Sequence, residues 1–426
     1  MGETMRMKTA HAQPTAYRTA LVAALDIGSS KIACVIGRSE PGSIKVLGAA
    51  LRESNGIRSG TITNLDDAVE SIGEAVAAAE NHADTRIQNV IVSVACGMPT
   101  SVTSRAAMAL DGELVSDDHL HLLLSEGHRR CQIEGVDVIQ SAPTSYVVDD
   151  ARGVRDPRGM FCQRIGVTMH AVAVKPAPLL NLKLAVERCH LSVAGTLFSG
   201  YASGLSTLTP DELQLGATVI DMGGGVTTIA VFIEGQLVFA DAVPIGGAHV
   251  TSDLARMLVA PVSAAERIKT LYAAALGDIE TGTDMVAVPQ MGEEGDEYAA
   301  RVPRSTLTRI VQPRLEEIFG QVQVKLRESG FDVAAGRRAI LTGGASQLAG
   351  TRELAQRVLN KQVRIGRPQT FPGLPAASAG PDYACALGLL MAGATMPPEV
   401  LNPDLQTAPR ERERSFLSKL TGGLFG

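Results

Sequence analysis

The chain has 426 residues, of which 45% are hydrophobic and 20% are charged, and its length predicts two to four packed units with a large core. The net charge is −6, and the aromatic residues are six Tyr, nine Phe and no Trp. Nucleic-acid-binding proteins usually carry a basic surface with stacking aromatic rings, so this composition excludes nucleic acid as an expected partner.

The six cysteines are scattered and form no C-x-x-C pair, which favours reduced thiols in a cytoplasmic protein over disulfides or a zinc site. The longest nearly uncharged apolar stretch, residues 384–396, is shorter than the roughly 20 residues of a membrane-spanning helix. It predicts a core helix instead. Residues 1–19 are polar, lack the apolar segment of a signal peptide and predict a disordered arm.

The first half of the chain alternates strands with helices. Apolar runs bounded by turn residues, and apolar residues at helical spacing, predict these elements in order: strands at 21–25, 32–36 and 44–51, a helix at 65–79 capped by Asn64, a strand at 87–94 and a helix at 179–189. Between the last two lie short strands, an amphipathic helix at 117–130 and a Gly/Pro/Asp-rich loop at 149–159. This change in the type and length of the predicted elements indicates an inserted subdomain.

The second half repeats the opening pattern and then departs from it. The predicted elements are strands on either side of a turn at 218–232, helices at 250–258, 264–276 and 305–327, a strand at 338–341 and a helix at 347–359. The three helices, with an acidic loop at 293–297, predict a second inserted region. Residues 397–410 are rich in proline and predict a linker.

Two turns of the same type lie about half the chain length apart. Asp26-Ile27-Gly28 and Asp221-Met222-Gly223 each join two apolar strands. A repeat at this spacing predicts two similar halves that face each other, each with one hairpin turned toward a shared ligand. A single D-x-G turn is common in ordinary hairpins, so the prediction depends on the repeat and its flanking strands.

The residue types in both turns suit phosphate binding. Backbone N–H groups approach a phosphate most closely where no Cβ intervenes, and small hydroxyl side chains add donors. Asp26 and Asp221 are predicted to hold a hydrated Mg²⁺ through water, and Lys31 to reach a β- or γ-phosphate. The predicted phosphate-binding residues are Gly28, Ser29, Ser30, Lys31, Gly223, Gly224, Gly225 and Thr227.

A third turn follows the strand at 338–341 and predicts an adenosine site at Gly343, Gly344 and Ser346, because a Gly-Gly turn lets the backbone lie against a nucleoside. Glu266 and Lys269 stand one helical turn apart and are candidates for contacts with ribose and adenine. Two alternatives stay open. Gly-Gly turns occur in many α/β folds, and an i, i+3 pair also fits an ion pair on an exposed helix face.

Three of these segments, LDIGSSK at 25–31, VIDMGGG at 219–225 and ILTGGA at 340–345, are similar to the phosphate-1, phosphate-2 and adenosine motifs of the actin/Hsp70/sugar-kinase ATPase superfamily. Within that superfamily the chain resembles the FtsA family of bacterial cell-division proteins. The segments that carry this closer resemblance are AVERC at 185–189, VTSDLA at 250–255, AERIK at 265–269 and QVRIG at 362–366. The likeness covers about residues 20–397.

The resemblance implies an α/β protein with an actin-like two-lobed ATPase fold, made of duplicated ribonuclease-H-like halves with an FtsA-type inserted subdomain and a C-terminal amphipathic helix. It divides the chain as follows: subdomain 1A at 20–96 and 177–200, inserted subdomain 1C at 97–176, subdomain 2A at 201–242 and 336–398, subdomain 2B at 243–335, a linker at 399–410 and a membrane-targeting helix at 411–426.

The resemblance also implies a function. The expected protein binds ATP and Mg²⁺, anchors the FtsZ ring to the cytoplasmic face of the inner membrane at the division septum, forms filaments with itself and recruits later division proteins through subdomain 1C. Subdomain 2B is expected to bind the C-terminal peptide of FtsZ, with Arg301 and Arg304 as basic candidates. Hydrolysis is expected to be slow at most, and no catalytic residue is assigned. The alternative is a small-molecule kinase of the same superfamily.

The last residues of the chain predict an interfacial helix, since their large apolar side chains share one face of a helical projection. The predicted membrane-contacting residues are Arg412, Arg414, Phe416, Leu417, Lys419, Leu420, Leu424 and Phe425. Gly422 and Gly423 lower helix propensity, so the expected binding to an anionic membrane surface is weak for one chain and firm for a polymer. A helix that docks on its own domain or on a partner is the alternative.

Overall fold

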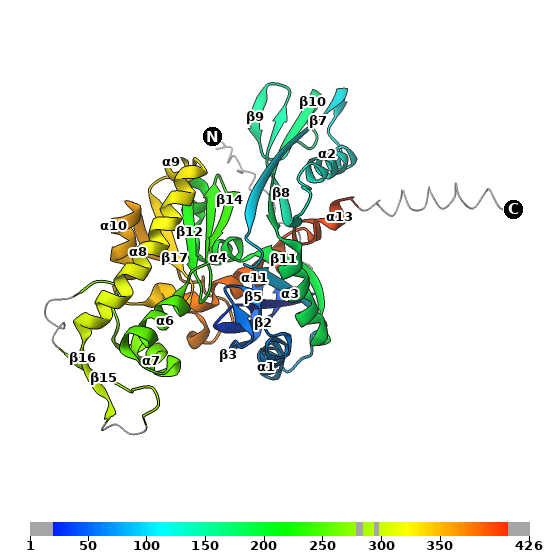
Figure 1. Ribbon diagram of the computed structural model, residues 1–426. Coiled ribbons are helices and arrows are strands. Elements are labelled where there is room, and N and C mark those ends of the chain that lie inside the picture. The colour runs from blue at the N-terminus through cyan, green and yellow to red at the C-terminus, as the bar shows by residue number, and fades with distance from the viewer. Residues whose placement is uncertain (1–19, 278–283, 294–297, 408–426) are drawn as a thin grey trace, which may run out of the picture.

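The computed structural model describes residues 20–277, 284–293 and 298–407. The predicted arm at 1–19, the predicted membrane-targeting helix with all its membrane-contacting residues and most of the acidic loop lie outside the described residues. Within these ranges the chain forms two lobes, each built on a five-stranded sheet (Figure 1). No helix in the described part of the chain is both long and apolar enough to span a bilayer.

The first lobe contains a sheet with the strand order β11-β6-β1-β2-β3. β1, β2 and β3 are antiparallel neighbours, whereas β1, β6 and β11 run parallel. The strands are β1 (Ala20–Ile27), β2 (Lys31–Glu40), β3 (Ser43–Glu53), β6 (Asn89–Val94) and β11 (Ser192–Phe198). The short pair β4 (Ile57–Arg58) and β5 (Thr61–Ile62) follows β3. The predicted hairpin and the predicted strands at 44–51 and 87–94 are confirmed.

The second lobe repeats this sheet with the order β14-β13-β12-β17-β18. β12, β13 and β14 are antiparallel neighbours, and β12, β17 and β18 run parallel. The strands are β12 (Ala217–Met222), β13 (Thr227–Ile233), β14 (Gln236–Val243), β17 (Arg338–Thr342) and β18 (Gln362–Ile365). Asp26 and Asp221 are the penultimate residues of equivalent strands, so the prediction of two similar halves is confirmed.

Two helices pack between the sheets. α4 (Ser199–Thr207) contacts β12 and β13, and α11 (Ala384–Thr395) contacts β1, β2 and β6. The two helices meet at Gly388, where an added Cβ would lie 1.7 Å from the carbonyl oxygen of Ala202. The core helix predicted at 384–396 is confirmed, because every residue of α11 from Ala384 to Leu390 is buried.

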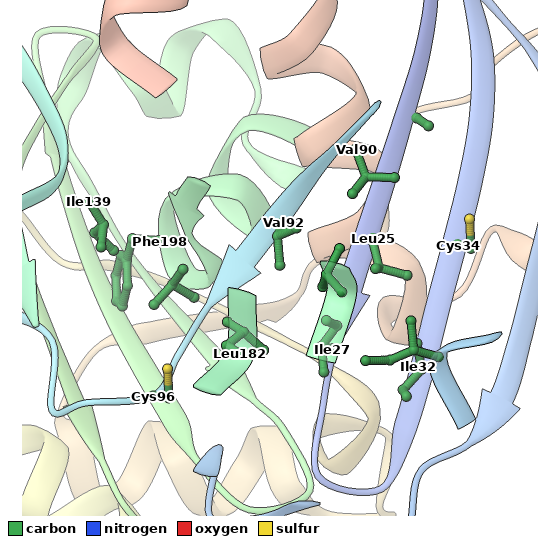
Figure 2. Packing of buried hydrophobic residues seen from close by; sticks show 14 of the residues in the cluster. Leu25, Ile27, Ile32, Cys34, Val90, Val92, Cys96, Ile139, Leu182 and Phe198 are labelled. Atoms are coloured by element: carbon green, nitrogen blue, oxygen red, sulfur yellow. The ribbon is translucent and has the colours of Figure 1, made fainter. Parts of the chain in front are cut away.

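Further helices cover the outer faces of the two sheets. On the first lobe, α1 (Leu65–Ala83) and α3 (Pro176–Arg188) share a core with β1, β2 and β6, part of which Figure 2 shows around Leu25, Ile32 and Leu182. Asn64 caps α1 as predicted, since its side chain accepts hydrogen bonds from the backbone N–H groups of Asp66 and Asp67. On the second lobe, buried residues of α6 (Gly247–Leu258), α8 (Arg304–Glu328) and α10 (Thr351–Leu359) pack with β12 and β13.

The first insertion forms a four-stranded antiparallel sheet with the order β7-β10-β8-β9, which Figure 1 shows above the two lobes. Its elements are β7 (Thr100–Leu114), α2 (Asp117–Arg129), β8 (Asp137–Val148), β9 (Ala151–Val154) and β10 (Phe161–Val174). Ile165 and Met169 lie in a core of its own. The loop predicted at 149–159 is wrong in part, because residues 151–154 pair with β8 as an edge strand.

The second insertion is mostly helical. Its elements are α6 (Gly247–Leu258), α7 (Val262–Tyr272), β15 (Met285–Val288), β16 (Ala300–Pro303), α8 (Arg304–Glu328) and α9 (Phe331–Ala334). After β17 the chain forms the 3₁₀ turn η2 (Gly344–Gln347), and α10 (Thr351–Leu359) follows. The observed helix therefore begins four residues later than the predicted helix at 347–359. Gly350 has φ +76°, a left-handed conformation that cannot continue a helix, so η2 and α10 are separate.

The predicted linker at 397–410 is wrong for its described part. α12 (Pro398–Leu401) contacts β8 and β11, and α13 (Asp404–Thr407) contacts α2 of the inserted subdomain. Leu401 is buried against Gly195 of β11, where an added Cβ would lie 2.8 Å from the Leu401 Cβ. Packing thus orders a segment whose proline content alone indicates an extended chain. The remaining elements are α5 (Pro210–Leu215), η3 (Ala376–Ser378) and η4 (Pro381–Tyr383).

His170 of β10 makes folding sensitive to pH. Its side chain is buried, with Nε2 2.9 Å from the hydroxyl oxygen of Ser101, and burial lowers its pKa from 6.5 to about 4. Between these pH values the unfolded chain binds a proton here that the folded chain does not. The contribution of His170 to the free energy of unfolding therefore falls as the pH is lowered from 6.5 toward 4.

We expect the wild-type chain to lose about 2 kcal/mol more unfolding free energy than His170→Gln when the pH is lowered from 7.5 to 5. Glutamine keeps a hydrogen-bonding side chain beside Ser101 and does not titrate. Urea unfolding of both chains at both pH values measures the difference, and the other titrating groups cancel because both chains contain them. Equal losses in the two chains would contradict this prediction.

Candidate nucleotide-binding site

The turn between β1 and β2 is closed by its own backbone. The N–H of Gly28 donates to the carbonyl oxygen of Lys31 at 3.1 Å, and an added Cβ on Gly28 would lie 2.7 Å from that oxygen. The hydroxyl of Ser29 accepts a hydrogen bond from the N–H of Gly60 at 2.8 Å. Glycine is therefore required at the first position, and the turn is fixed by contacts within its own lobe.

The turn between β12 and β13 repeats this geometry. The N–H of Gly223 donates to Val226 at 3.0 Å, and an added Cβ would lie 2.8 Å from the same carbonyl oxygen. The first turn of α6 stabilises this turn, because the N–H of Gly247 donates to the carbonyl oxygen of Gly223 at 3.0 Å. A Cβ on Gly224 would lie 2.0 Å from the Ser30 hydroxyl oxygen, so the turns of the two lobes touch.

The third turn lies against the second aspartate. Gly343 follows β17 with φ +80°, and its N–H donates to the carbonyl of Pro381 at 3.1 Å. An added Cβ on Gly343 would lie 2.2 Å from Asp221 Oδ1. Both the left-handed backbone and this close approach exclude larger residues.

The three turns border one cavity of about 460 Å³ between the lobes. Residues from β1, β12, α7 and the segment after β17 therefore converge, although they lie far apart in the sequence. The predicted site residues that line this cavity are Asp26, Gly28, Ser29, Ser30, Lys31, Asp221, Gly223, Gly224, Gly225, Glu266, Lys269, Gly343 and Gly344.

Two predicted site residues do not border the cavity. Thr227 is fully buried, and its hydroxyl donates to the carbonyl of Ile245 at 2.8 Å. Ser346 is also buried, and its hydroxyl donates to the carbonyl of Gly343 at 2.7 Å. Both hydroxyl groups stabilise the turns next to the cavity instead of facing it.

Sequence reasoning missed several residues of the cavity wall. Gly247 and Ala248 belong to the first turn of α6, which the sequence prediction placed three residues too late, although the Gly246-Gly247 pair signals a helix start. Ser199 and Thr228 face the cavity from the first turn of α4 and from β13. The other missed wall residues with polar side chains are Thr270, Gln347, Asp382 and Cys385.

The two aspartates at the cavity are strongly perturbed. Burial raises the pKa of Asp26, and it raises the pKa of Asp221 to about 7, where the nearby Asp26 adds to the effect. Ser203 opposes this shift by donating its hydroxyl to Asp221 Oδ2 at 2.6 Å. Because burial makes both carboxylates costly to ionise, a cation beside the pair would stabilise their charged form.

Glu266 and Lys269 lie together at the α7 end of the cavity. Lys269 Nζ donates to Glu266 Oε2 at 2.6 Å, to the hydroxyl of Thr251 at 2.9 Å and to the carbonyl of Gly247 at 3.3 Å. Burial alone would raise the pKa of Glu266, but hydrogen bonds from Lys269 and Thr251 outweigh it and leave the pKa lowered. The i, i+3 ion pair is therefore present, and it lines the cavity as well.

The two arginines predicted for a partner site lie on the second insertion, away from the cavity. Arg301 is exposed on β16. Arg304 begins α8, and its Nε donates to the carbonyl of Tyr272 at 3.0 Å. Arg301 thus has an exposed guanidinium, whereas that of Arg304 is tied to the backbone.

Comparison with known proteins identifies the family. A family profile described as "Cell division protein FtsA" matches residues 218–388, and one described as "SHS2 domain inserted in FTSA" matches residues 97–173. A cell division protein FtsA of Rhizobium meliloti is 43% identical over 387 residues, which cover 88% of this chain and 87% of the relative. The chain belongs to the FtsA family. An FtsA of Escherichia coli is 34% identical over 88% of this chain and 90% of its own length.

Solved structures agree with the fold of this FtsA-family chain. The PilM-PilN type IV pilus biogenesis complex matches with a TM-score of 0.61 at 16% identity, covering 89% of this chain and 99% of the other. MreB5 of Spiroplasma citri bound to ADP matches with a TM-score of 0.52 at 10% identity, covering 91% and 98%. These structures show that the chain has the actin-like ATPase fold, and its membership of the FtsA family makes it a cell-division protein.

Proposed function

We propose that the cavity between the lobes binds ATP with Mg²⁺, and that the chain uses this nucleotide in cell division. The observation that supports this most is the convergence of two equivalent glycine turns, one from each half, on the same cavity. In turns of this kind no Cβ stands between the backbone and a ligand, so a phosphate can approach the backbone N–H groups closely. A ligand with several phosphates contacts both turns at once and holds the lobes together.

The wall residues fit such a ligand. Gly28 to Lys31 and Gly223 to Gly225 would hold the phosphates, and Asp26 and Asp221 would hold hydrated Mg²⁺, which neutralises phosphate charge. Gly343 and Gly344 would lie against the nucleoside, with Glu266 and Lys269 near its ribose. Thr227 and Ser346 would support the turns from outside the cavity.

We further propose the cellular role that the FtsA family suggests. Subdomain 2B, residues 243–335, would bind the C-terminal peptide of FtsZ, and subdomain 1C, residues 97–176, would contact neighbouring copies and later division proteins. Residues 411–426 would attach the chain to the cytoplasmic face of the inner membrane at the septum. Bound ATP would act mainly by closing the cleft and favouring filaments.

Reconstitution tests this role. The full chain, anionic liposomes and fluorescent FtsZ are mixed with and without Mg·ATP and then sedimented. We expect FtsZ to sediment with the liposomes only when the full chain is present. A chain that ends at residue 407 is the matched control and should leave FtsZ in solution. Failure to recruit FtsZ under every nucleotide condition would contradict the proposal.

Reversing the charge of the two arginines should weaken FtsZ-peptide binding about fivefold or more, because an acidic peptide loses its basic partners. The variant is Arg301→Glu with Arg304→Glu, and fluorescence anisotropy of a labelled peptide measures the affinity. Arg337→Glu is the control, since Arg337 is also exposed but lies between α9 and β17, on another part of the second lobe. An unchanged affinity in the double variant would remove both arginines from the site.

A further inference from the structure

The inserted subdomain is fastened to the second lobe through Ser101, near the start of β7. The hydroxyl oxygen of Ser101 accepts a hydrogen bond from the N–H of Ala240 at 2.7 Å and lies 3.2 Å from the carbonyl oxygen of the same residue. Ala240 belongs to β14, the edge strand of the second sheet. One side chain of the insertion therefore bonds to both backbone groups of Ala240, which in the described sheet pairs with β13 on one side and with no strand on the other.

His170, which also belongs to the inserted subdomain, holds the Ser101 hydroxyl in position. Its Nε2 lies 2.9 Å from the Ser101 hydroxyl oxygen, and only 4% of its surface is exposed. β10, which carries His170, also packs beside β14. The Ser101 hydroxyl is therefore held in place by its own subdomain while it bonds to the second lobe.

The same subdomain is fastened to the first lobe by β8. Gln140 Oε1 accepts a hydrogen bond from the N–H of Phe198 at 2.8 Å, and the hydroxyl of Thr196 donates to the carbonyl of Ile139 at 2.9 Å. Ile139 and Phe198 belong to the same cluster of buried apolar side chains, part of which Figure 2 shows. This attachment is buried and includes both apolar and polar contacts.

The attachment to the first lobe is adjacent in the chain to the cavity wall. Phe198, which Gln140 holds, is followed by Ser199 in the cavity wall. The hydroxyl of Ser199 lies 3.5 Å from that of Thr228, which lines the cavity from the second lobe. Thr228 pairs with Ala242 of β14, two residues after the strand position that Ser101 bonds. The insertion thus contacts the β11–α4 junction and β14, while the cavity wall contains Ser199 of that junction and Thr228 of β13, the strand that pairs with β14.

We propose that the inserted subdomain is a link across the cleft, and that Mg·ATP in the cavity tightens its Ser101 attachment to the second lobe. The inference rests on the proposed nucleotide binding and goes beyond it. A ligand held by both glycine turns restricts relative motion of the lobes, and the Ser101–Ala240 contact, which joins the insertion of the first lobe to the second lobe, is strained by that motion. Gln140 is a positioning residue, because it sets the β11–α4 junction that carries Ser199.

The coupling acts in both directions. If nucleotide tightens the attachment, then any partner that holds the inserted subdomain against β14 raises nucleotide affinity by the same factor. Loss of the Ser101 hydroxyl should accordingly weaken Mg·ATP binding about twofold to fivefold, although Ser101 does not contact the cavity.

Hydrogen–deuterium exchange of the full chain, with and without Mg·ATP, tests the link. We expect nucleotide to slow exchange at 26–31 and 221–225, and also to slow it about threefold or more at 100–104 and 238–242, which lie outside the cavity. In Ser101→Ala the slowing at 100–104 and 238–242 should disappear, whereas the slowing at 26–31 and 221–225 should remain. Ser101→Thr should restore the slowing at 100–104 and 238–242. Thr144→Val is the matched control, because the Thr144 hydroxyl donates to Thr168 within the inserted sheet.

The outcomes separate this link from nucleotide binding itself. Slower exchange in the turns of the wild-type chain without a change at 100–104 and 238–242 would overturn the link alone. No slowing in the turns would overturn nucleotide binding and the link with it. A response in Ser101→Ala equal to that of the wild-type chain would show that Ser101 does not carry the coupling.

Discussion

Replacing Gly388 with alanine is expected to lower the free energy of unfolding by about 3 kcal/mol or more. The added Cβ would lie 1.7 Å from the carbonyl oxygen of Ala202, so α4 and α11 would have to separate. Both helices are packed between the two sheets, and a separation there disturbs both lobes. Urea unfolding followed by circular dichroism measures the loss.

Gly320→Ala is the matched control for this prediction. Gly320 also lies inside a helix, α8, but beyond its chain neighbours and its own helix backbone no atom lies within 4 Å of an added Cβ. Alanine should raise the free energy of unfolding here by about 0.5–1 kcal/mol, because it restricts the unfolded chain and favours the helix. If Gly388→Ala were as stable as the wild-type chain, the close approach of α4 and α11 would be wrong.

The second large effect concerns the contact between the two glycine turns. Gly224→Ala should weaken Mg·ATP binding about tenfold or more, because a misplaced turn no longer presents its N–H groups to the phosphates. The new methyl group would lie 2.0 Å from the Ser30 hydroxyl oxygen and 2.8 Å from the Ser30 Cβ. Titration of the chain with a fluorescent ATP analogue measures the affinity.

A second substitution separates this steric effect from other causes. Ser30→Gly removes the two nearest atoms, the Ser30 hydroxyl oxygen and Cβ, and leaves the backbone nitrogen, at 3.3 Å, as the nearest, so the double variant with Gly224→Ala should bind nucleotide more tightly than Gly224→Ala alone. Ser30→Gly by itself reports the cost of losing the serine hydroxyl. No recovery in the double variant would show that the contact between the turns does not explain the loss.

Local patterns were sufficient to predict most of the fold. The repeat of Asp26 and Asp221 at the ends of apolar strands predicted two similar sheets, and the two sheets have equivalent strand orders. Most of the predicted site residues line one cavity, since a tight glycine turn is specified by a few neighbouring residues. The resemblance to the FtsA family supplied the division into subdomains, which periodicity alone does not give.

Features that depend on tertiary packing could not be predicted in this way. Ser199, Thr228 and Asp382 line the cavity because four distant segments converge there, and no local pattern around them signals a ligand. Leu401 lies in a proline-rich segment that indicates a linker, yet it is buried against Gly195. Thr227 and Ser346 have the residue types of a phosphate site, but their hydroxyl groups bond to nearby carbonyls.

The packing of α12 and α13 determines which parts of the molecule would first receive a force applied to the residues after 407. α12 lies against β8 and β11, and α13 lies against α2, so this end of the chain rests on the inserted subdomain and the first lobe. A pull on the residues beyond 407 is therefore delivered first to the joint between those two units. The second lobe receives that pull through α11, which precedes α12 in the chain and contacts α4, and through contacts that cross the cleft, such as the hydrogen bond between Ser101 and Ala240.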